Sequence, residues 1–267
     1  MKSIARFAIV LAVIPILMLP GCGKKDVIKS EREMYESAYD ALSRARYETA
    51  IERYEALRAA YPYGELSTQG DLEICYAYYK TKQFELTAPC IDRFLADHPT
   101  HSQIDYAYYL KGLALLPVRP PKFGETFFRS KSDLTDHDAE TGREAYAAFS
   151  EVIERFPLSE YADASREKLV QLINVFARHD LQIALFYLER KAYIGAANRA
   201  SRVLKRYESS PYTEEALAIL VYAYDRMNLP DLSADNRRVL QFNYPASIYL
   251  TDVSAIFEDA ALESDIE

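Results

Sequence analysis

The sequence predicts an all-α fold, a superhelix of about five antiparallel helix pairs stacked in chain order. A turn in which an aromatic residue or a histidine is followed by a proline recurs along the chain. The recurrences are Tyr61-Pro62, His98-Pro99, Phe156-Pro157, Tyr207 to Pro211 and Tyr244-Pro245. Twelve, eight and five residues before Pro62 lie Ala50, Tyr54 and Leu57, and the same offsets before Pro157 hold Ala, Phe and Val. The repeated spacing indicates one structural unit that is used several times.

This unit has the spacing of the second helix of a tetratricopeptide repeat, whose period is about 34 residues. The small residue lets two helices approach, the aromatic residue fills the space between them, and the proline ends the helix. Successive turns are 37, 58, 51 and 37 residues apart. We therefore expect insertions in the two longer intervals.

Charge and composition restrict the class of partner. The formal net charge is −8, and it becomes −10 when a leader containing Lys2 and Arg6 is removed. Nucleic-acid binding normally requires a basic face, so we expect no nucleic-acid partner. The chain has 22 Tyr and no Trp, and tyrosine suits surfaces that are half apolar and half wet.

Residues 1–21 are predicted to be a signal peptide. Lys2 and Arg6 precede an apolar run at 7–19 that is too short to span a bilayer comfortably. Leu19 to Cys22 resembles the bacterial lipobox, which implies cleavage and a covalent lipid on Cys22. Gly23, in place of Asp, implies sorting to the periplasmic face of the cell outer membrane. The alternative is an ordinary secretory peptide with an incidental cysteine.

The N-terminal half is expected to contain a lipidated tether at 22–29 and three repeats at 30–157. We expect its helices at 30–46, 47–61, 68–80, 84–97, 102–116 and 140–156, from apolar residues recurring at helical spacing. Prolines and a glycine between 117 and 124 forbid a continuous helix, so 117–139 is predicted to be an inserted loop.

The C-terminal half is expected to contain repeats four and five, at 158–246. The segment 159–193 has no Pro or Gly, and it predicts one long helix, or two with a bend near His179 and Asp180. Further helices are expected at 194–207, 211–227 and 233–242. Residues 247–267 form an acidic tail.

Two cysteines remain after Cys22, and they lie on the two expected helices of the second repeat. Export permits a disulfide between Cys75 and Cys90. Cys75 occupies a position where the repeat needs a small buried residue, so we expect two packed free thiols instead.

The first helices of repeats one to three should line the concave side of the superhelix. Their inward positions carry six tyrosines: Tyr35, Tyr39, Tyr76, Tyr79, Tyr106 and Tyr109. Such a groove suits an extended segment with alternating apolar and aromatic residues, which is the chemistry of an outer-membrane β-strand. The alternative is that these rings only pack neighbouring repeats together.

A second candidate surface is a basic helix face. It comprises Asn198, Arg199, Arg202 and Arg206. The three arginines can share one side of a helix. The alternative is an ordinary solvated helix side.

The sequence gives no support for catalysis. The histidines at 98, 101, 137 and 179 are scattered, and no zinc-binding spacing of His or Cys occurs. The aspartates at 133, 136 and 138 lack the glycine and terminal glutamate of a calcium loop. We expect a protein that is not an enzyme and that holds no metal and no cofactor beyond its lipid.

Several stretches together distinguish this chain from other repeat proteins better than the repeat pattern alone does. They are Tyr61 to Gly64, Ile74 to Lys80, Ile91 to Phe94, His98 to His101, Ile104 to Tyr106, Phe127 to Asp133, Glu189-Arg190 and Asn198-Arg199. These stretches resemble the BamD family, lipoproteins of the β-barrel assembly machinery of the Gram-negative outer membrane. The resemblance covers nearly the whole mature chain, and the sequence departs from it at 117–122 and after Tyr244.

The resemblance implies a binding function. It implies that Arg199 pairs with a carboxylate of the BamA POTRA domain, that other Bam lipoproteins are partners, and that the N-terminal repeats bind nascent β-barrel proteins. The alternative is a different periplasmic repeat lipoprotein, an adaptor for peptidoglycan synthesis or envelope tethering.

Overall fold

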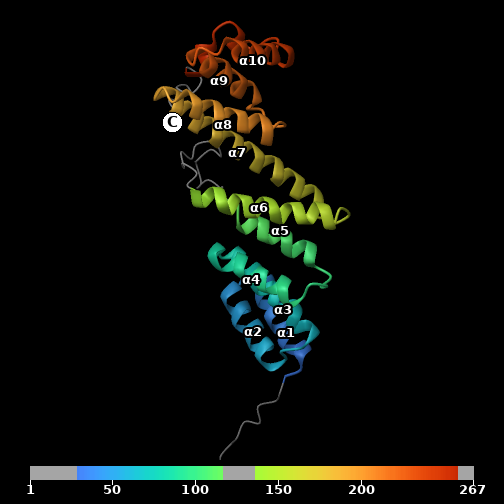
Figure 1. The fold of residues 1–267 in the computed structure, drawn as a ribbon. Helices are drawn as coiled ribbons and strands as arrows, with labels where there is room; N and C mark the ends of the chain where they lie inside the picture. The colour runs from blue at the N-terminus through green and yellow to red at the C-terminus, as the bar shows by residue number, and fades with distance from the viewer. Residues whose placement is uncertain (1–28, 117–135, 258–267) are drawn as a thin grey trace, which may run out of the picture.

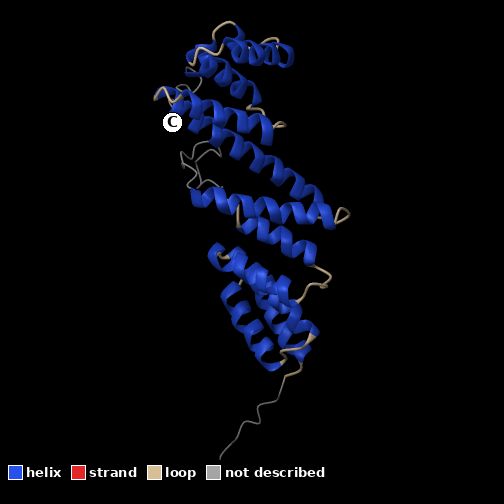
Figure 2. Ribbon diagram, viewed as in Figure 1, coloured by secondary structure: helices blue, strands red, loops and turns tan. Residues whose placement is uncertain are grey.

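A computed structural model describes residues 29–116 and 136–257. Its helices are α1 Glu31–Ser43, α2 Tyr47–Ala60, α3 Glu65–Lys80, α4 Phe84–Asp97, α5 Ile104–Ala114, α6 Asp136–Arg155, α7 Ala162–Glu189, α8 Tyr193–Arg206, α9 Thr213–Arg226 and α10 Pro230–Asn243 (Figure 1). Figure 2 shows that the described residues contain helices and loops and no strand. The predicted all-α fold of about five helix pairs is therefore confirmed.

The helices stack in pairs along the length of the molecule (Figure 1). Each odd-numbered helix packs against the even-numbered helix that comes after it. The first helices of neighbouring pairs also touch, because α1 contacts α3, α3 contacts α5 and α7 contacts α9. The first helices thus form a continuous inner layer within each half of the stack, as the repeat pattern predicts.

The five recurring turns share one backbone geometry. In each, the carbonyl of the aromatic residue or histidine accepts a hydrogen bond from the N–H three residues later, at 2.9 to 3.1 Å. The donors are Gly64, His101, Ser159, Ser210 and Ser247. The offsets measured from these turns also identify the core, since Ala50, Tyr54, Leu57 and their counterparts near Pro157 are all buried.

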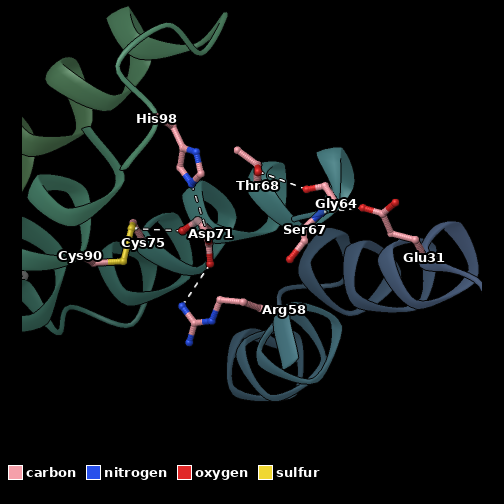
Figure 3. Close-up of polar contacts among 9 residues, drawn as sticks. All are labelled: Glu31, Arg58, Gly64, Ser67, Thr68, Asp71, Cys75, Cys90 and His98. Carbon is pink, nitrogen blue, oxygen red and sulfur yellow. Dashed lines mark hydrogen bonds and ion pairs between the residues drawn. A yellow bond between two sulfur atoms is a disulfide. The ribbon is translucent and has the colours of Figure 1, made fainter. Parts of the chain in front are cut away.

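The residue at this donor position usually caps the start of the next helical segment. Ser159, Ser210 and Ser247 accept a hydrogen bond on Oγ from the N–H two residues later, and His101 does so on Nδ1. Gly64 has no side chain for this role. Instead, Glu31 at the start of α1 reaches across, and its Oε1 accepts from the N–H groups of Leu66 and Ser67 at 2.8 and 3.1 Å (Figure 3).

Each of the four turns inside a pair that lie within the described residues uses a left-handed residue. These residues are Ala45, Lys82, Lys191 and Asn228, with φ between 55° and 61°. The next N–H in each turn bonds back to a carbonyl five residues earlier, as in a Schellman motif. None of the four is glycine, so the sequence hides this recurrence.

Several helix boundaries differ from the predictions, by up to four residues. Helix α6 begins at Asp136, so the predicted loop at 117–139 ends four residues too late. The rest of that loop, with Phe127 and Phe128, lies outside the described residues. Helix α7 is one unbroken helix, which is the first of the two predicted alternatives.

The beginning of the predicted tail is part of the fold. Tyr249 and Ile256, in and just after two short 3-10 turns at Ile248–Leu250 and Val253–Ala255, are buried in the C-terminal core. Phe257 packs edge-on against Tyr222 of α9. The last acidic residues, 258–267, lie outside the described residues.

The prediction of free thiols is wrong. Cys75 of α3 and Cys90 of α4 form a disulfide, with a Cα–Cα distance of 5.6 Å (Figure 3). Cys75 is buried, as its repeat position predicts. The two helices nevertheless approach closely enough at this point for the sulfurs to bond, and the spacing of cysteines along a chain does not reveal such an approach.

Candidate binding surfaces

The inner layer contains a hollow of about 170 Å³ between α1, α3 and α5. We call it the inner hollow. Its lining includes Leu42 of α1, Gln69, Glu73 and Tyr76 of α3, and Gln103 and Tyr106 at the start of α5. The three α3 residues lie at helical spacing, so they share the side of α3 that faces this space.

Glu73 is held in place by neutral donors. Its Oε1 accepts from the Tyr35 hydroxyl at 2.7 Å and from Gln69 Nε2 at 3.2 Å. Its Oε2 accepts from the Tyr54 hydroxyl. Burial, followed by the hydrogen bond and the charge of Glu73, raises the pKa of both Tyr35 and Tyr54. The two hydroxyls therefore remain protonated and keep donating to the carboxylate.

The six predicted groove tyrosines all lie on the inner layer but not in one cavity. Tyr76 and Tyr106 line the inner hollow, and Tyr35 reaches it through Glu73. Tyr39 stacks on Tyr35 with ring centroids 6.2 Å apart, and 52% of its surface is exposed. The remaining five are half-buried. Their role as a binding groove stays a prediction.

The tyrosines also pack between repeats, which was the alternative interpretation. Tyr106 and Tyr109 both contact the ring of Tyr161, at 5.2 and 5.1 Å between centroids. Tyr79 packs within its own pair, against Phe84 of α4. The rings therefore stabilise the stack and still expose part of their surface on the inner side.

Sequence reasoning missed the polar part of the inner hollow. Gln69 and Glu73 precede Tyr76 by seven and three residues, so the spacing that selected Tyr76 could also have selected them. Gln103 could not be found in this way, because it lies in the turn before α5.

The four residues of the predicted basic face on α8 differ in their surroundings. Arg199 pairs with Asp180 of α7 at 3.0 Å, and Arg202 pairs with the same carboxylate oxygen. About one third of each arginine side chain remains exposed, at 32% and 35%. Asn198 and Arg206 are exposed. The structure thus places a carboxylate partner for Arg199 within the chain.

Asp180 explains why these arginines lie where they do. Its side chain is only 6% exposed, and a buried carboxylate requires compensation by positive charge. Tyr207 lies near the same cluster, where burial and then the charge of Asp180 raise its pKa. From the sequence, Asp180 is expected only near a bend between two helices, which is one of the two alternatives for 159–193.

Known proteins match this chain over most of its length. The model of the YfiO family, described as "Outer membrane lipoprotein", matches residues 28–240. The outer membrane protein assembly factor BamD of Neisseria gonorrhoeae is 38% identical over 222 residues, covering 83% of this chain and 82% of that protein. The chain belongs to the BamD family of outer membrane lipoproteins.

One further BamD relative and one solved structure are also similar to this chain. The BamD of Vibrio cholerae is 32% identical over 241 residues, covering 89% of this chain and 99% of that protein. A tetratricopeptide-repeat protein of Thermus thermophilus has a TM-score of 0.37 and 13% identity, covering 85% of this chain and 99% of that chain.

BamD-family membership confirms the resemblance stated from the sequence. The matched range includes the inner hollow and the basic face. Cys22 lies outside the described residues. Within them, no helix has the length and apolar character needed to cross a bilayer.

Proposed function

We propose that this chain is a non-enzymatic lipoprotein of the β-barrel assembly complex, anchored by lipid on Cys22 to the periplasmic face of the outer membrane. It binds the BamA POTRA domain, other Bam lipoproteins and nascent β-barrel proteins. Family membership supports the assembly role, because its relatives are named outer membrane protein assembly factors.

The observation that carries the client-binding part is the inner hollow with its row of half-buried tyrosines. Aromatic rings that stay partly exposed on a pre-formed concave surface can pack against the side chains of an extended segment. A strand of an outer-membrane β-barrel alternates apolar and polar residues and has aromatic residues near its ends. The apolar and aromatic side chains of such a strand are the groups that these rings would contact.

A peptide-binding measurement tests this part. Peptides from the C-terminal strand of an outer-membrane barrel protein should bind the mature chain, and Tyr76→Ala with Tyr79→Ala should weaken binding by about tenfold or more, as expected for central aromatic contacts. Tyr63→Ala is the matched control, because Tyr63 is 99% exposed at a turn outside the hollow. Equal affinity for all three proteins would refute the groove.

The basic face on α8 is the proposed docking site for the POTRA domain. Arg199 and Arg202 pair with Asp180, yet part of each arginine side chain remains exposed to solvent. The exposed residues Arg206 and Asn198 belong to the same face. Charge reversal at Arg199 would also leave Asp180 with one partner, so it mixes docking with stability.

Arg206 separates these two effects. Arg206→Glu should reduce co-purification of BamA from detergent-solubilised outer membranes, because it reverses an exposed charge on the docking face. Lys205→Glu changes the charge equally at the neighbouring exposed residue, off the shared side, and should leave co-purification intact. If the chain recovered enzymes of peptidoglycan synthesis and no BamA, the adaptor alternative would replace this proposal.

The lipid anchor has a direct test. With residues 1–21 replaced by a secretory leader that is cleaved without lipidation, Cys22→Ala should move the protein from the outer-membrane fraction to the soluble periplasm, because covalent acyl chains provide the membrane affinity. Retention of Cys22→Ala in the membrane fraction in the absence of BamA would contradict lipid anchoring at this residue.

A further inference from the structure

The inner hollow contains a carboxylate without a cationic partner among the described residues. Glu73 accepts hydrogen bonds from Tyr35, Tyr54 and Gln69, and all three donors are neutral. By contrast, Asp71, two residues earlier on the same helix, pairs with Arg58 at 3.1 Å and approaches His98 at 3.9 Å (Figure 3). Asp180 is paired with two arginines. Glu73 is thus anchored in position while its charge is not neutralised by a neighbour.

The hydrogen bonds leave capacity for one more donor. An ionised carboxylate offers about four acceptor positions, and the three neutral donors use three of them. Glu73 lines the inner hollow, so the remaining position is available to a group that enters there. A charged donor would form the stronger, charge-assisted type of hydrogen bond.

The walls of the hollow also favour a cation. Tyr76 and Tyr106 line it, and tyrosine ring faces attract ammonium and guanidinium groups. The Lys80 ammonium already lies 5.8 Å from the centroid of the Tyr76 ring, which shows that this ring can take a cation on one face. Gln69 and Gln103 add amide oxygens at the rim that can accept further hydrogen bonds.

The volume of the hollow limits what can enter. Pockets for drug-sized ligands typically measure about 300 to 1,000 Å³. The inner hollow, at about 170 Å³, is smaller and accommodates a single side chain. A free carboxyl terminus would be repelled there by Glu73.

We propose that the inner hollow is a subsite for one cationic side chain, arginine or lysine, of an extended client segment, with Glu73 as its counter-charge. This inference rests on the proposed client binding and specifies its chemistry. It assigns the hollow to an internal residue of the segment, while the neighbouring tyrosines contact the apolar and aromatic residues on either side.

A matched set of peptides tests the subsite. The probe is a fluorescently labelled strand peptide in which polar residues alternate with apolar and aromatic ones, and arginine, citrulline or glutamate is placed at each polar position in turn. Citrulline keeps the shape of arginine and removes its charge. In fluorescence anisotropy with the full mature chain in detergent, one position should show an affinity about tenfold higher for arginine than for citrulline.

The variants assign this preference to Glu73. Glu73→Gln keeps an acceptor oxygen for one tyrosine hydroxyl and offers an amide donor to the other, which can accept through its oxygen. It should reduce the preference to less than about twofold while the citrulline peptide binds as before. Glu55→Gln removes the same charge from an exposed position on α2 and should keep the preference. Gln103→Lys adds a cation at the exposed rim, where it would repel the arginine of the peptide, so it should also abolish the preference for arginine. It provides a second variant if Glu73→Gln does not fold.

Each outcome decides a separate point. If arginine and citrulline peptides bind the unmodified chain equally at every position, the cationic subsite is refuted and the tyrosine groove stands. A preference that survives both Glu73→Gln and Gln103→Lys also refutes it, because the cation then binds elsewhere. If none of the peptides binds, client recognition through this face is refuted as well.

Discussion

At the scale of single residues, the same turn is completed by different side chains. Four turns are capped from within by Ser159, Ser210, Ser247 and His101, whereas the turn at Gly64 is capped from α1 by Glu31. A Cβ added to Gly64 would lie 2.1 Å from Glu31 Oε1. The glycine and the distant carboxylate therefore depend on each other.

The dependence predicts non-additive substitutions. Glu31→Ala should destabilise the chain by about 1 kcal/mol, the usual effect of losing a helix cap. In a Gly64→Ser background the serine can cap the turn itself, so adding Glu31→Ala should cost much less. Urea unfolding of the four proteins of this double-mutant cycle measures the coupling. Equal costs in both backgrounds would contradict the exchange of capping roles.

His101, the only titratable side chain among the four that cap their own turns, makes the stability of the fold depend on pH. Burial, and then the nearby charge of His98, lowers the pKa of His101 from 6.5. As pH falls, the unfolded chain therefore binds the proton before the folded chain does. The stabilising contribution is complete above pH 6.5 and is lost as pH falls through that value towards the folded pKa.

Protonation would also remove the acceptor Nδ1 that caps Gln103. His101→Gln, which does not titrate, should show a smaller decrease in thermal midpoint between about pH 7 and about pH 5 than the unmodified chain. Parallel decreases in the two proteins would show that other groups cause the effect.

At the scale of elements, the helix pairs are closed by tight turns and, in one pair, by a covalent bond. The turn between α3 and α4 contains Lys82 at φ 61°, a region that costs a non-glycine residue about 1 to 2 kcal/mol. The same two helices are joined by the Cys75–Cys90 disulfide. The second pair is therefore closed both by a left-handed turn and by a covalent bond.

Lys82→Gly should stabilise the chain by about 0.5 to 1 kcal/mol, since relief of the left-handed conformation exceeds the entropy that glycine adds to the unfolded chain. Glu55→Gly, at an exposed position within α2, should instead cost about 1 kcal/mol. Chemical denaturation distinguishes the two. A loss of stability in Lys82→Gly would show that the lysine side chain contributes more than the turn geometry requires.

The loss of stability on reduction of the disulfide can be estimated from the length of the loop that it closes. The bond closes a loop with a sequence separation of 15, for which loss of chain entropy in the unfolded state corresponds to about 3 kcal/mol. The unmodified chain should therefore unfold at lower urea concentration after addition of dithiothreitol. A Cys75→Ala, Cys90→Ala double variant should not respond to the reductant. An unchanged midpoint for the reduced chain would contradict the estimate.

At the scale of the whole molecule, the stack is one continuous array, and its C-terminal end is covered by the segment after α10. Tyr249 and Ile256 are 7% and 0% exposed against the last core cluster. Terminal repeats need such a covering because they lack a neighbour on one side.

Truncation tests this cover. A chain ending at Tyr244 loses both buried side chains, each worth about 1.5 to 3 kcal/mol, and should unfold at clearly lower urea concentration. A chain ending at Phe257 keeps both and should match the full-length protein. If the shorter chain were as stable as the longer one, the segment after Tyr244 would not contribute to the array.

The sequence predicts those parts of this molecule that are encoded locally and repeatedly. The aromatic residue, proline and small residues at fixed offsets identify the turns, the pairs and the buried positions around Tyr54 and Phe149. The disulfide, the Glu31 cap and the Asp180 cluster each depend on distances between helices that no local pattern specifies. The inner hollow is intermediate, because the spacing identifies Tyr76 and Tyr106 but not the anchoring of Glu73.

The contacts at the very start of the folded region determine how mechanical load would enter it. The Lys29 carbonyl accepts a hydrogen bond from the Tyr61 hydroxyl at 2.8 Å, and Glu31 accepts one from the Leu66 N–H at the beginning of α3. A force applied along the N-terminal linker would therefore act on the turn after α2 and on the start of α3 as soon as α1 begins to move. Helix α1 would therefore resist being peeled away alone, and the first two pairs would take up tension as a single body.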